Sequence, residues 1–188
     1  MGRAYSEGRG VQTNQEESVK WFEKSAGQKQ PEAILALGDV YLRGREGVPI
    51  DCREAARWFR KALELGRVDA LNSLGIIYER GGGGVDQDAR QALACYREAA
   101  EKGNAQGQMN LGRMYFDGIG VPTDFAEAYK WFYLGSKNGD RIARHYLDEL
   151  TGNNILPSAR PTPEQIAAAL RQANEIDRQI KRKKAPNE

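Results

Sequence analysis

A short pattern returns three times along this chain, and this repetition constrains the fold more than any other feature of the sequence. Leucine and glycine are followed by tyrosine and then by a second glycine, in the order L-G-x-x-Y-x-x-G. The pattern begins at Leu37, Leu74 and Leu111, so each copy starts 37 residues after the one before. A fixed period of roughly 20 to 50 residues is typical of stacked structural repeats. One repeat of this size cannot bury its apolar face alone, so the copies must pack on one another.

A second pattern follows each copy and completes the repeat. It consists of a Gly-Val pair, an aspartate, an alanine and two adjacent residues that are mostly aromatic. The three copies are Gly47, Val48, Asp51, Ala55, Trp58 and Phe59; Gly84, Val85, Asp88, Ala92, Cys95 and Tyr96; and Gly120, Val121, Asp124, Ala128, Trp131 and Phe132. An incomplete copy comes first, with Trp21 and Phe22 at the aromatic positions. We therefore expect residue 1 to lie inside a repeat that a longer parent protein would complete.

Each repeat is predicted to contain two helices and no strand. In the second helix, Ala55, Trp58 and Phe59 recur at helical spacing and form one apolar stripe. In the first helix, Leu37 and Tyr41 share a face. The glycines between these positions remove a side chain where the partner helix can approach closely. They are Gly38, Gly75 and Gly112.

The ends of the second helices are marked by two residue types. An aspartate precedes each apolar stripe, where its carboxylate can accept hydrogen bonds from free backbone N–H groups. A glycine follows the stripe, where a left-handed C-terminal cap is needed. These residues are Asp51, Asp88 and Asp124, and Gly66, Gly103 and Gly139. Residues 27–31 (Gly-Gln-Lys-Gln-Pro) lack the cap glycine, so we expect the first turn between repeats to be reshaped.

These motifs resemble the Sel-1-like repeat (SLR) family, which is related to the tetratricopeptide repeats, over residues 1 to about 140. A tetratricopeptide unit has about 34 residues, whereas these have 36 or 37, with the excess in the Gly-rich link. The resemblance implies an all-α fold, an α-solenoid with a right-handed superhelix of helix-turn-helix repeats and a C-terminal helix. It also implies a scaffold or adaptor that assembles proteins, often bacterial, without chemistry of its own.

The repeat frame and the residues after it predict the order of segments along the chain. After residue 139 the frame fades, and a helix, a turn-rich linker and a helix that begins with the capping box Thr162-Pro163-Glu164-Gln165 follow. The apolar stripe of that final helix is Ile166, Leu170, Ala173, Ile176 and Ile180. We expect a partial repeat at 1–31, repeats at 32–67, 68–104 and 105–139, a capping helix at 140–150, a linker at 151–162 and an amphipathic helix at 163–184.

No constellation for catalysis is visible, so we expect no enzyme activity, no cofactor and no metal site. The chain has two cysteines and a single histidine, His145, without a nucleophile motif around it. The run Gly81 to Gly84 lacks the strand and the Lys-Ser/Thr of a phosphate loop, which favours a permissive turn. Net charge is +2, and without the four cations of residues 181–184 the rest carries −2. Nucleic acid is therefore not an expected partner, and the basic run is read as a solvated tail.

The candidate binding residues lie on the first helices, opposite the stripe that packs within the repeat. At 100° per residue, they form a mixed apolar and charged strip. If first helices line a concave side, this strip is a groove suited to a peptide or helix. Packing between adjacent first helices, or docking of the final helix, would be the alternatives. The residues are Leu35, Asp39, Leu42, Arg43, Asn72, Ile76, Glu79, Arg80, Met109, Arg113, Phe116 and Asp117. Because they face away from the core, we expect serine at Leu42, Ile76 and Phe116 together to leave the fold intact.

The sequence thus predicts a non-catalytic scaffold or adaptor whose groove binds a peptide, helix or protein. The alternative is a regulatory or immunity-like inhibitor that binds one specific protein. No stretch is long and apolar enough to span a membrane, and the N-terminus lacks the apolar run of a signal peptide. We expect a cytoplasmic protein if the chain is complete, whereas a larger parent with a signal peptide would change that. The oligomeric state stays open, with a monomer among the options.

Overall fold

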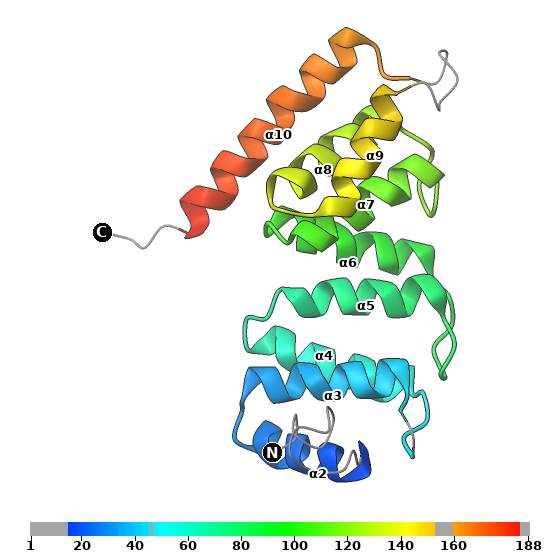
Figure 1. The fold of residues 1–188 in the computed structure, drawn as a ribbon, viewed down its shortest axis with the longest axis vertical. Helices are drawn as coiled ribbons and strands as arrows, with labels where there is room; N and C mark the ends of the chain where they lie inside the picture. Colours follow the sequence, from blue (N-terminus) through cyan, green and yellow to red (C-terminus); the bar gives the residue numbers. More distant parts are fainter. Residues whose placement is uncertain (1–14, 46, 153–159, 185–188) are drawn as a thin grey trace. The chain divides into compact units, whose positions relative to one another are not determined.

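The computed structural model describes residues 15–45, 47–152 and 160–184, and all regular structure in these residues is α-helical (Figure 1). The predicted all-α class is therefore confirmed. Two isolated β-bridges, Arg45 with Val48 and Gly82 with Val85, close turns in the links. The helices are α2 (Gln15–Gly27), α3 (Pro31–Arg43), α4 (Cys52–Glu64), α5 (Asp69–Arg80), α6 (Ala89–Glu101), α7 (Ala105–Asp117), α8 (Phe125–Lys137), α9 (Arg141–Thr151) and α10 (Pro163–Lys184).

The chain divides into two compact units, Met1–Asp88 and Ala89–Glu188. The N-terminal unit contains α2 to α5, and the C-terminal unit contains α6 to α10. Within each unit, a first helix packs on the second helix of its own repeat, as α3 does on α4 and α7 on α8. Each first helix also packs on the second helix that precedes it, as α5 does on α4 and α7 on α6.

Glycines in the first helices allow each first helix to approach the second helix of its repeat closely, because they have no side chain. A Cβ atom at Gly38 would lie 2.5 Å from the ring of Phe59, and one at Gly112 would lie 2.6 Å from the ring of Phe132. Real Cβ atoms do not approach other atoms so closely, so any side chain here would push the paired helices apart. The predicted close approach is confirmed at both positions.

The predicted caps are present at Asp51 and Asp124. Asp51 accepts a hydrogen bond from the Glu54 backbone N–H at 2.9 Å, and Asp124 accepts one from the Glu127 N–H at 2.9 Å. These bonds satisfy N–H groups that have no partner within the helix. The cap glycines Gly66, Gly103 and Gly139 have φ of 80°, 78° and 95°.

The first turn between repeats keeps the geometry of the later turns, so its expected reshaping is wrong. Lys29 stands where the next repeat has Gly66, and it adopts the same left-handed conformation with φ of 55°. The backbone N–H groups of Lys29 and Gln30 donate to residues three and five positions back, as those of Gly66 and Arg67 do. A lysine in this conformation costs about 1–2 kcal/mol through its Cβ, a cost that the turn tolerates.

The Gly-rich links pack on the second helix of the preceding repeat. In the N-terminal unit, the carbonyl of Gly83 accepts a hydrogen bond from the Cys52 N–H at 2.9 Å, and a Cβ at Gly83 would lie 2.7 Å from that nitrogen. In the C-terminal unit, a Cβ at Gly120 would lie 2.8 Å from the carbonyl oxygen of Ala89. Close backbone approach and positive φ, rather than phosphate binding, account for these glycines.

A hydrogen bond from an arginine to a tyrosine recurs between consecutive repeats in both units. Arg60 of α4 donates to the Tyr78 hydroxyl of α5 at 2.9 Å, and Arg97 of α6 donates to the Tyr115 hydroxyl of α7 at 2.8 Å. Both residues of the second pair lie 37 positions after those of the first. This side-chain contact is therefore part of the repeat.

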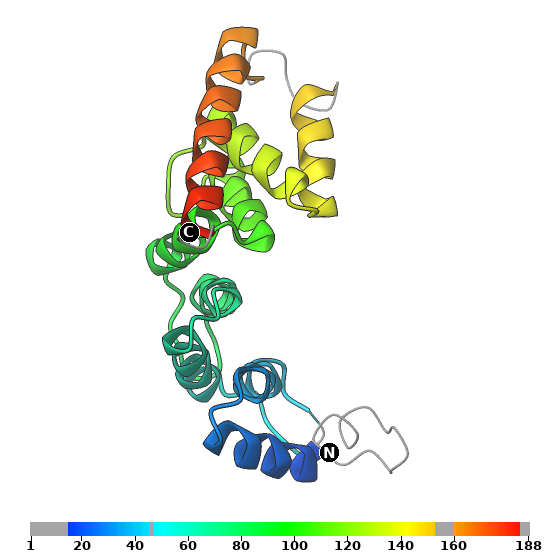
Figure 2. The ribbon, with the colours of Figure 1, turned by 90° about the vertical axis from the view of Figure 1, so that its left-hand side faces the viewer.

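Two helices of the C-terminal unit cover different parts of α8, as Figure 2 shows. On one side, α9 places Tyr146 on Phe132, with ring centroids 4.7 Å apart and planes 4° from parallel. On the other side, α10 buries Ala169, Ala173 and Ile180. Of the predicted α10 stripe, Ala173 and Ile180 are buried, whereas Ile166, Leu170 and Ile176 are half-buried.

The contact between α10 and α8 is partly polar. The Asp177 carboxylate, whose side chain is only 10% exposed, accepts hydrogen bonds from Lys137 and Lys181 at 2.9 Å each. The amine of Lys130 donates to Gln172 at 3.0 Å.

The capping box at the start of α10 is confirmed, because the Gln165 N–H donates to the Thr162 hydroxyl at 3.2 Å and the Gln165 side chain accepts from the Thr162 N–H.

Candidate functional site

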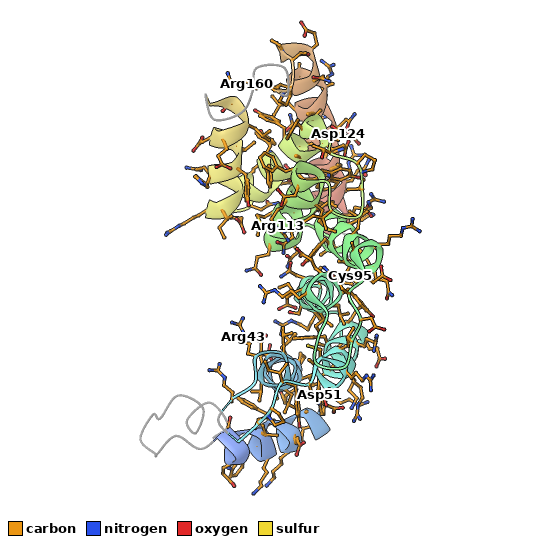
Figure 3. The ribbon with its side chains drawn as sticks, turned by 90° about the vertical axis from the view of Figure 1, so that its right-hand side faces the viewer. Arg43, Asp51, Cys95, Arg113, Asp124 and Arg160 are labelled. Carbon is orange, nitrogen blue, oxygen red and sulfur yellow. The ribbon has the colours of Figure 1, made fainter. Side chains whose placement is uncertain are left out.

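In the N-terminal unit, the predicted binding residues of α3 and α5 leave one mixed surface open. Leu35 and Leu42 are half-buried, and Asp39 and Arg43 are exposed. Figure 3 labels Arg43 beside α3 and Asp51 at the start of α4. On α5, Ile76 and Glu79 are half-buried and Arg80 is exposed, whereas Asn72 is buried and belongs to the interior. We name Leu35, Asp39, Leu42, Arg43, Ile76, Glu79 and Arg80 the α3–α5 face.

Arg67, in the turn before α5, ties the N-terminal ends of α3 and α5 together. Its guanidinium lies 2.8 Å from the Glu32 carboxylate of α3 and 2.8 Å from the Asp69 carboxylate of α5. The equivalent positions of the neighbouring repeats are the uncharged Gln30 and Asn104. This pair of ion pairs is therefore specific to α3 and α5.

The Asp39 carboxylate occupies a crowded part of the α3–α5 face. Burial raises the pKa of Asp39, and the negative charge of Asp69 raises it further, although Arg43 and Arg45 act in the opposite direction. The side chain is nevertheless exposed to solvent. No hydrogen bond or ion pair joins Asp39 to another residue in the described part of the chain.

In the C-terminal unit, Met109 and Phe116 are half-buried as well, but they pack against a neighbouring aromatic cluster. Phe116 belongs to an aromatic cluster, with ring centroids 5.5 Å from Phe125, 5.6 Å from Tyr146 and 6.2 Å from Phe132. Met109 packs against the same core. The expectation that Phe116 faces away from the core is wrong, because α9 brings Tyr146 over it.

The charged positions of α7 are paired with each other. Arg113, labelled in Figure 3, lies 3.8 Å from Asp117 one turn later on the same helix. The structure therefore brings the predicted residues of α3 and α5 together as an accessible face, whereas Met109 and Phe116 take part in packing.

The structure adds two residues to the candidate site that the sequence analysis missed. Arg67 and Asp69 form an ion pair at the start of α5, and Arg67 also contacts Glu32 of α3. The available signal was their departure from the repeat, since Asp69 stands where the next repeat has Gln106. A charged residue that departs from the repeat pattern therefore indicates a feature specific to that repeat.

The described residues contain no group of three or more His, Cys, Asp and Glu side chains placed to hold a metal ion. His145 is exposed on α9, and its nearest charged neighbour is Glu149 at 3.7 Å. Among the helices that the structure describes, none combines the length and apolar character needed to cross a membrane.

The profile of the Sel1 repeat matches four segments of the chain, residues 1–29, 31–66, 68–104 and 105–140. Among curated proteins, none is similar enough to count as a relative.

Three solved structures show the same architecture. A protective antigen of uropathogenic Escherichia coli with an SLR fold is 33% identical, with a TM-score of 0.69; the match covers 93% of this chain and 36% of the antigen. The chain thus spans about a third of that protein. A Sel1 repeat protein from Oxalobacter formigenes is 31% identical, with a TM-score of 0.74, over 92% of this chain and 67% of that one. Cysteine-rich protein B of Helicobacter pylori is 23% identical, with a TM-score of 0.54 over 70% of this chain and 93% of its own, and this likeness concerns the fold alone.

Proposed function

The chain belongs to the Sel1-repeat family, and from that premise we propose that it is a non-catalytic scaffold whose α3–α5 face binds a peptide or helix of a partner protein. Sel1-repeat proteins generally mediate protein–protein interactions, and the family is generally non-enzymatic. To this general role the proposal adds the binding surface on this chain and the type of ligand.

The observation that carries the proposal is the accessibility of Leu42 and Ile76. Both apolar side chains are half-buried on a face that no described helix of the N-terminal unit covers. Phe116, the counterpart of Leu42, is also half-buried, but its ring packs on Tyr146 of α9. Partly exposed apolar side chains next to charged ones are typical of protein interaction surfaces. A partner that covers them gains about 25 cal/mol per Å² of apolar surface removed from water.

The test is the double variant Leu42→Ser/Ile76→Ser in the full chain. Peptides selected from a display library on the native protein should lose binding to this variant, while its circular-dichroism melt stays within a few degrees of the native one. Ile142→Ser is the matched control, since this side chain is 55% exposed and lies on α9, outside the face. The control should bind the selected peptides as the native protein does.

Two other results would redirect the proposal. Unchanged peptide binding in the double variant would show that the α3–α5 face is not the binding surface. Tight binding of one folded protein at this face, without binding of any peptide, would instead indicate a regulatory or immunity-like inhibitor.

A further inference from the structure

We infer that Asn138 and Gly139, in the turn between α8 and α9, form a site of spontaneous deamidation that the fold of the C-terminal unit protects. Asn138 is followed directly by glycine, and this is the one Asn-Gly pair in the chain. The corresponding turns have Leu65 and Lys102 before their glycines. The inference concerns a covalent change in the chain itself and is independent of the proposed function.

The reaction needs only these two residues and water. The backbone nitrogen of Gly139 attacks the side-chain carbon Cγ of Asn138, and the bond from Cγ to Nδ2 breaks. Nδ2 leaves as ammonia with the proton that the Gly139 nitrogen gives up, and a cyclic imide remains. Water then opens one of the two carbonyl–nitrogen bonds of the imide, which yields either aspartate or isoaspartate. Glycine favours the attack because it has no Cβ atom to obstruct ring closure.

Solvent and space are available at this turn. Asn138 and Gly139 are both exposed. A Cβ atom at Gly139 would meet no atom of the described residues within 4 Å. Water can therefore reach the imide, and the backbone has room to rearrange while the ring forms.

Two hydrogen bonds hold the reacting groups away from each other in the folded chain. The Nδ2 amide of Asn138, which is the leaving group, donates to Oε1 of Gln108 at 2.8 Å. The backbone N–H of Gly139, which carries the attacking nitrogen, donates to the carbonyl oxygen of Ser136 at 3.0 Å. Both bonds must break before the nitrogen can reach Cγ. The rate of deamidation in the folded chain therefore follows the fraction of time that the turn spends open.

The amide of Asn138 is one end of a buried chain of hydrogen bonds, so its loss reaches beyond the turn. Gln108 is fully buried, and its Nε2 donates to the carbonyl oxygen of Ala100 at 3.1 Å. This chain joins the end of α8 to α7 and α6. A carboxylate at position 138 has no proton to donate and would face the Oε1 acceptor. Turning the Gln108 amide over would place the same oxygen against the carbonyl of Ala100, so one hydrogen bond is lost in either orientation.

The rates of deamidation in the folded and unfolded chain test the protection. The full chain is incubated in buffer and in urea, and residues 138 and 139 are followed by mass spectrometry of peptides, with an isoaspartyl methyltransferase to detect isoaspartate. The urea-unfolded chain should be modified at least about tenfold faster. Gln108→Leu removes the acceptor and introduces the residue that Leu71 supplies in the preceding repeat. It should speed the reaction in the folded chain at least about threefold.

Gln172→Leu is the matched control. It removes an amide that Lys130 contacts on α10, away from the turn, so its rate in the folded chain should stay within about twofold of the native rate. No modification in urea would overturn the site itself. Equal rates in the folded and unfolded chain, or equal rates with and without Gln108→Leu, would overturn the protection.

A double-mutant cycle tests the consequence of the modification. Asn138→Asp introduces the carboxylate of the product and should lower the midpoint of thermal unfolding by at least about 3 °C. In a chain that already carries Gln108→Leu, the same change should lower the midpoint by at most about half as much, because no buried acceptor faces the carboxylate. Equal shifts in the two backgrounds would overturn the inferred link between the turn and α7.

Discussion

Equivalent positions of the repeat have different surroundings in the two units. Leu42 of α3 and Phe116 of α7 occupy the same place in the frame, two repeats apart. Both side chains are half-buried, but Leu42 lies on a face that no described helix of its unit covers, whereas Phe116 packs among Phe125, Phe132 and Tyr146 in the C-terminal unit. The difference comes from α9, which adds a covering helix on one side of α8 and α7. A position in the repeat therefore sets the direction of a side chain, and the neighbouring helices decide whether it meets solvent.

The second helices show the same contrast. The outer positions of α4 are Arg53, Arg57, Arg60 and Lys61, and the equivalent positions of α8 are Ala126, Lys130, Tyr133 and Leu134. Leu134 is fully buried and Lys130 nearly so, because α10 packs on α8. The replacement of cations by apolar residues on one copy of a helix thus marks the place where another helix docks.

The largest expected difference in the free energy of unfolding is between variants at the equivalent positions Phe116 and Leu42. Phe116→Ser should lower the free energy of unfolding by about 3 kcal/mol, because it removes a ring from a packed aromatic cluster. Leu42→Ser should lower it by less than about 1 kcal/mol, because the side chain is already partly in water. Urea denaturation of both variants, followed by circular dichroism, gives the two values. Equal losses would contradict the contrast between the units.

The next largest effect on stability is expected at Asp177, which joins α10 to α8 through Lys137. Hydrogen bonds from Lys137 and Lys181 hold the pKa of Asp177 below its usual range. A carboxyl whose pKa is lowered by folding stabilises the fold above its unfolded pKa, and the contribution is lost as the pH falls through the lower, folded value. The change with pH therefore belongs to the Asp177 carboxyl, whose pKa is the one lowered.

Asp177→Asn should therefore cost about 2 kcal/mol at pH 7, the scale of hydrogen bonds to a charged group in a partly buried contact. The cost should shrink when the pH is lowered below about 4. Thermal melts of native protein and variant between pH 7 and pH 3 measure it. A difference that stayed constant over this range would show that Asp177 does not act through its charge.

The sequence analysis predicted the repeated parts of the molecule well and the unrepeated parts less well. The close approach at Gly38, the cap at Asp51 and the capping box at Thr162 each depend on local chemistry that one sequence displays. The covering of Phe116 depends on where α9 packs, and that is a long-range contact without a local signal. The ion pair of Arg67 with Glu32 joins two residues that lie 35 positions apart, which no spacing along the chain encodes.

A smaller effect is expected at the turn that lacks a glycine. Lys29→Gly should raise the free energy of unfolding by about 1 kcal/mol, because glycine adopts the left-handed conformation without a Cβ penalty. Gly66→Lys should lower it by a similar amount at the equivalent turn. Chemical denaturation of both variants tests the equivalence of the two turns. A destabilised Lys29→Gly would mean that the lysine side chain contributes a contact worth more than the strain.

The smallest effect tests a feature that both units share. Arg60 and Arg97 each donate a hydrogen bond from an exposed guanidinium to a tyrosine hydroxyl of the next repeat. Because water competes for both groups, Tyr78→Phe and Tyr115→Phe should each lower the free energy of unfolding by about 0.5 kcal/mol. The losses should be alike in the two units, since the geometry repeats even where the surfaces differ. Tyr133→Phe is the matched control for removing a tyrosine hydroxyl from the C-terminal unit without touching this bond. A loss at Tyr115 several times that at Tyr78 would show that the C-terminal unit depends on its covering helices even for contacts that belong to the repeat itself.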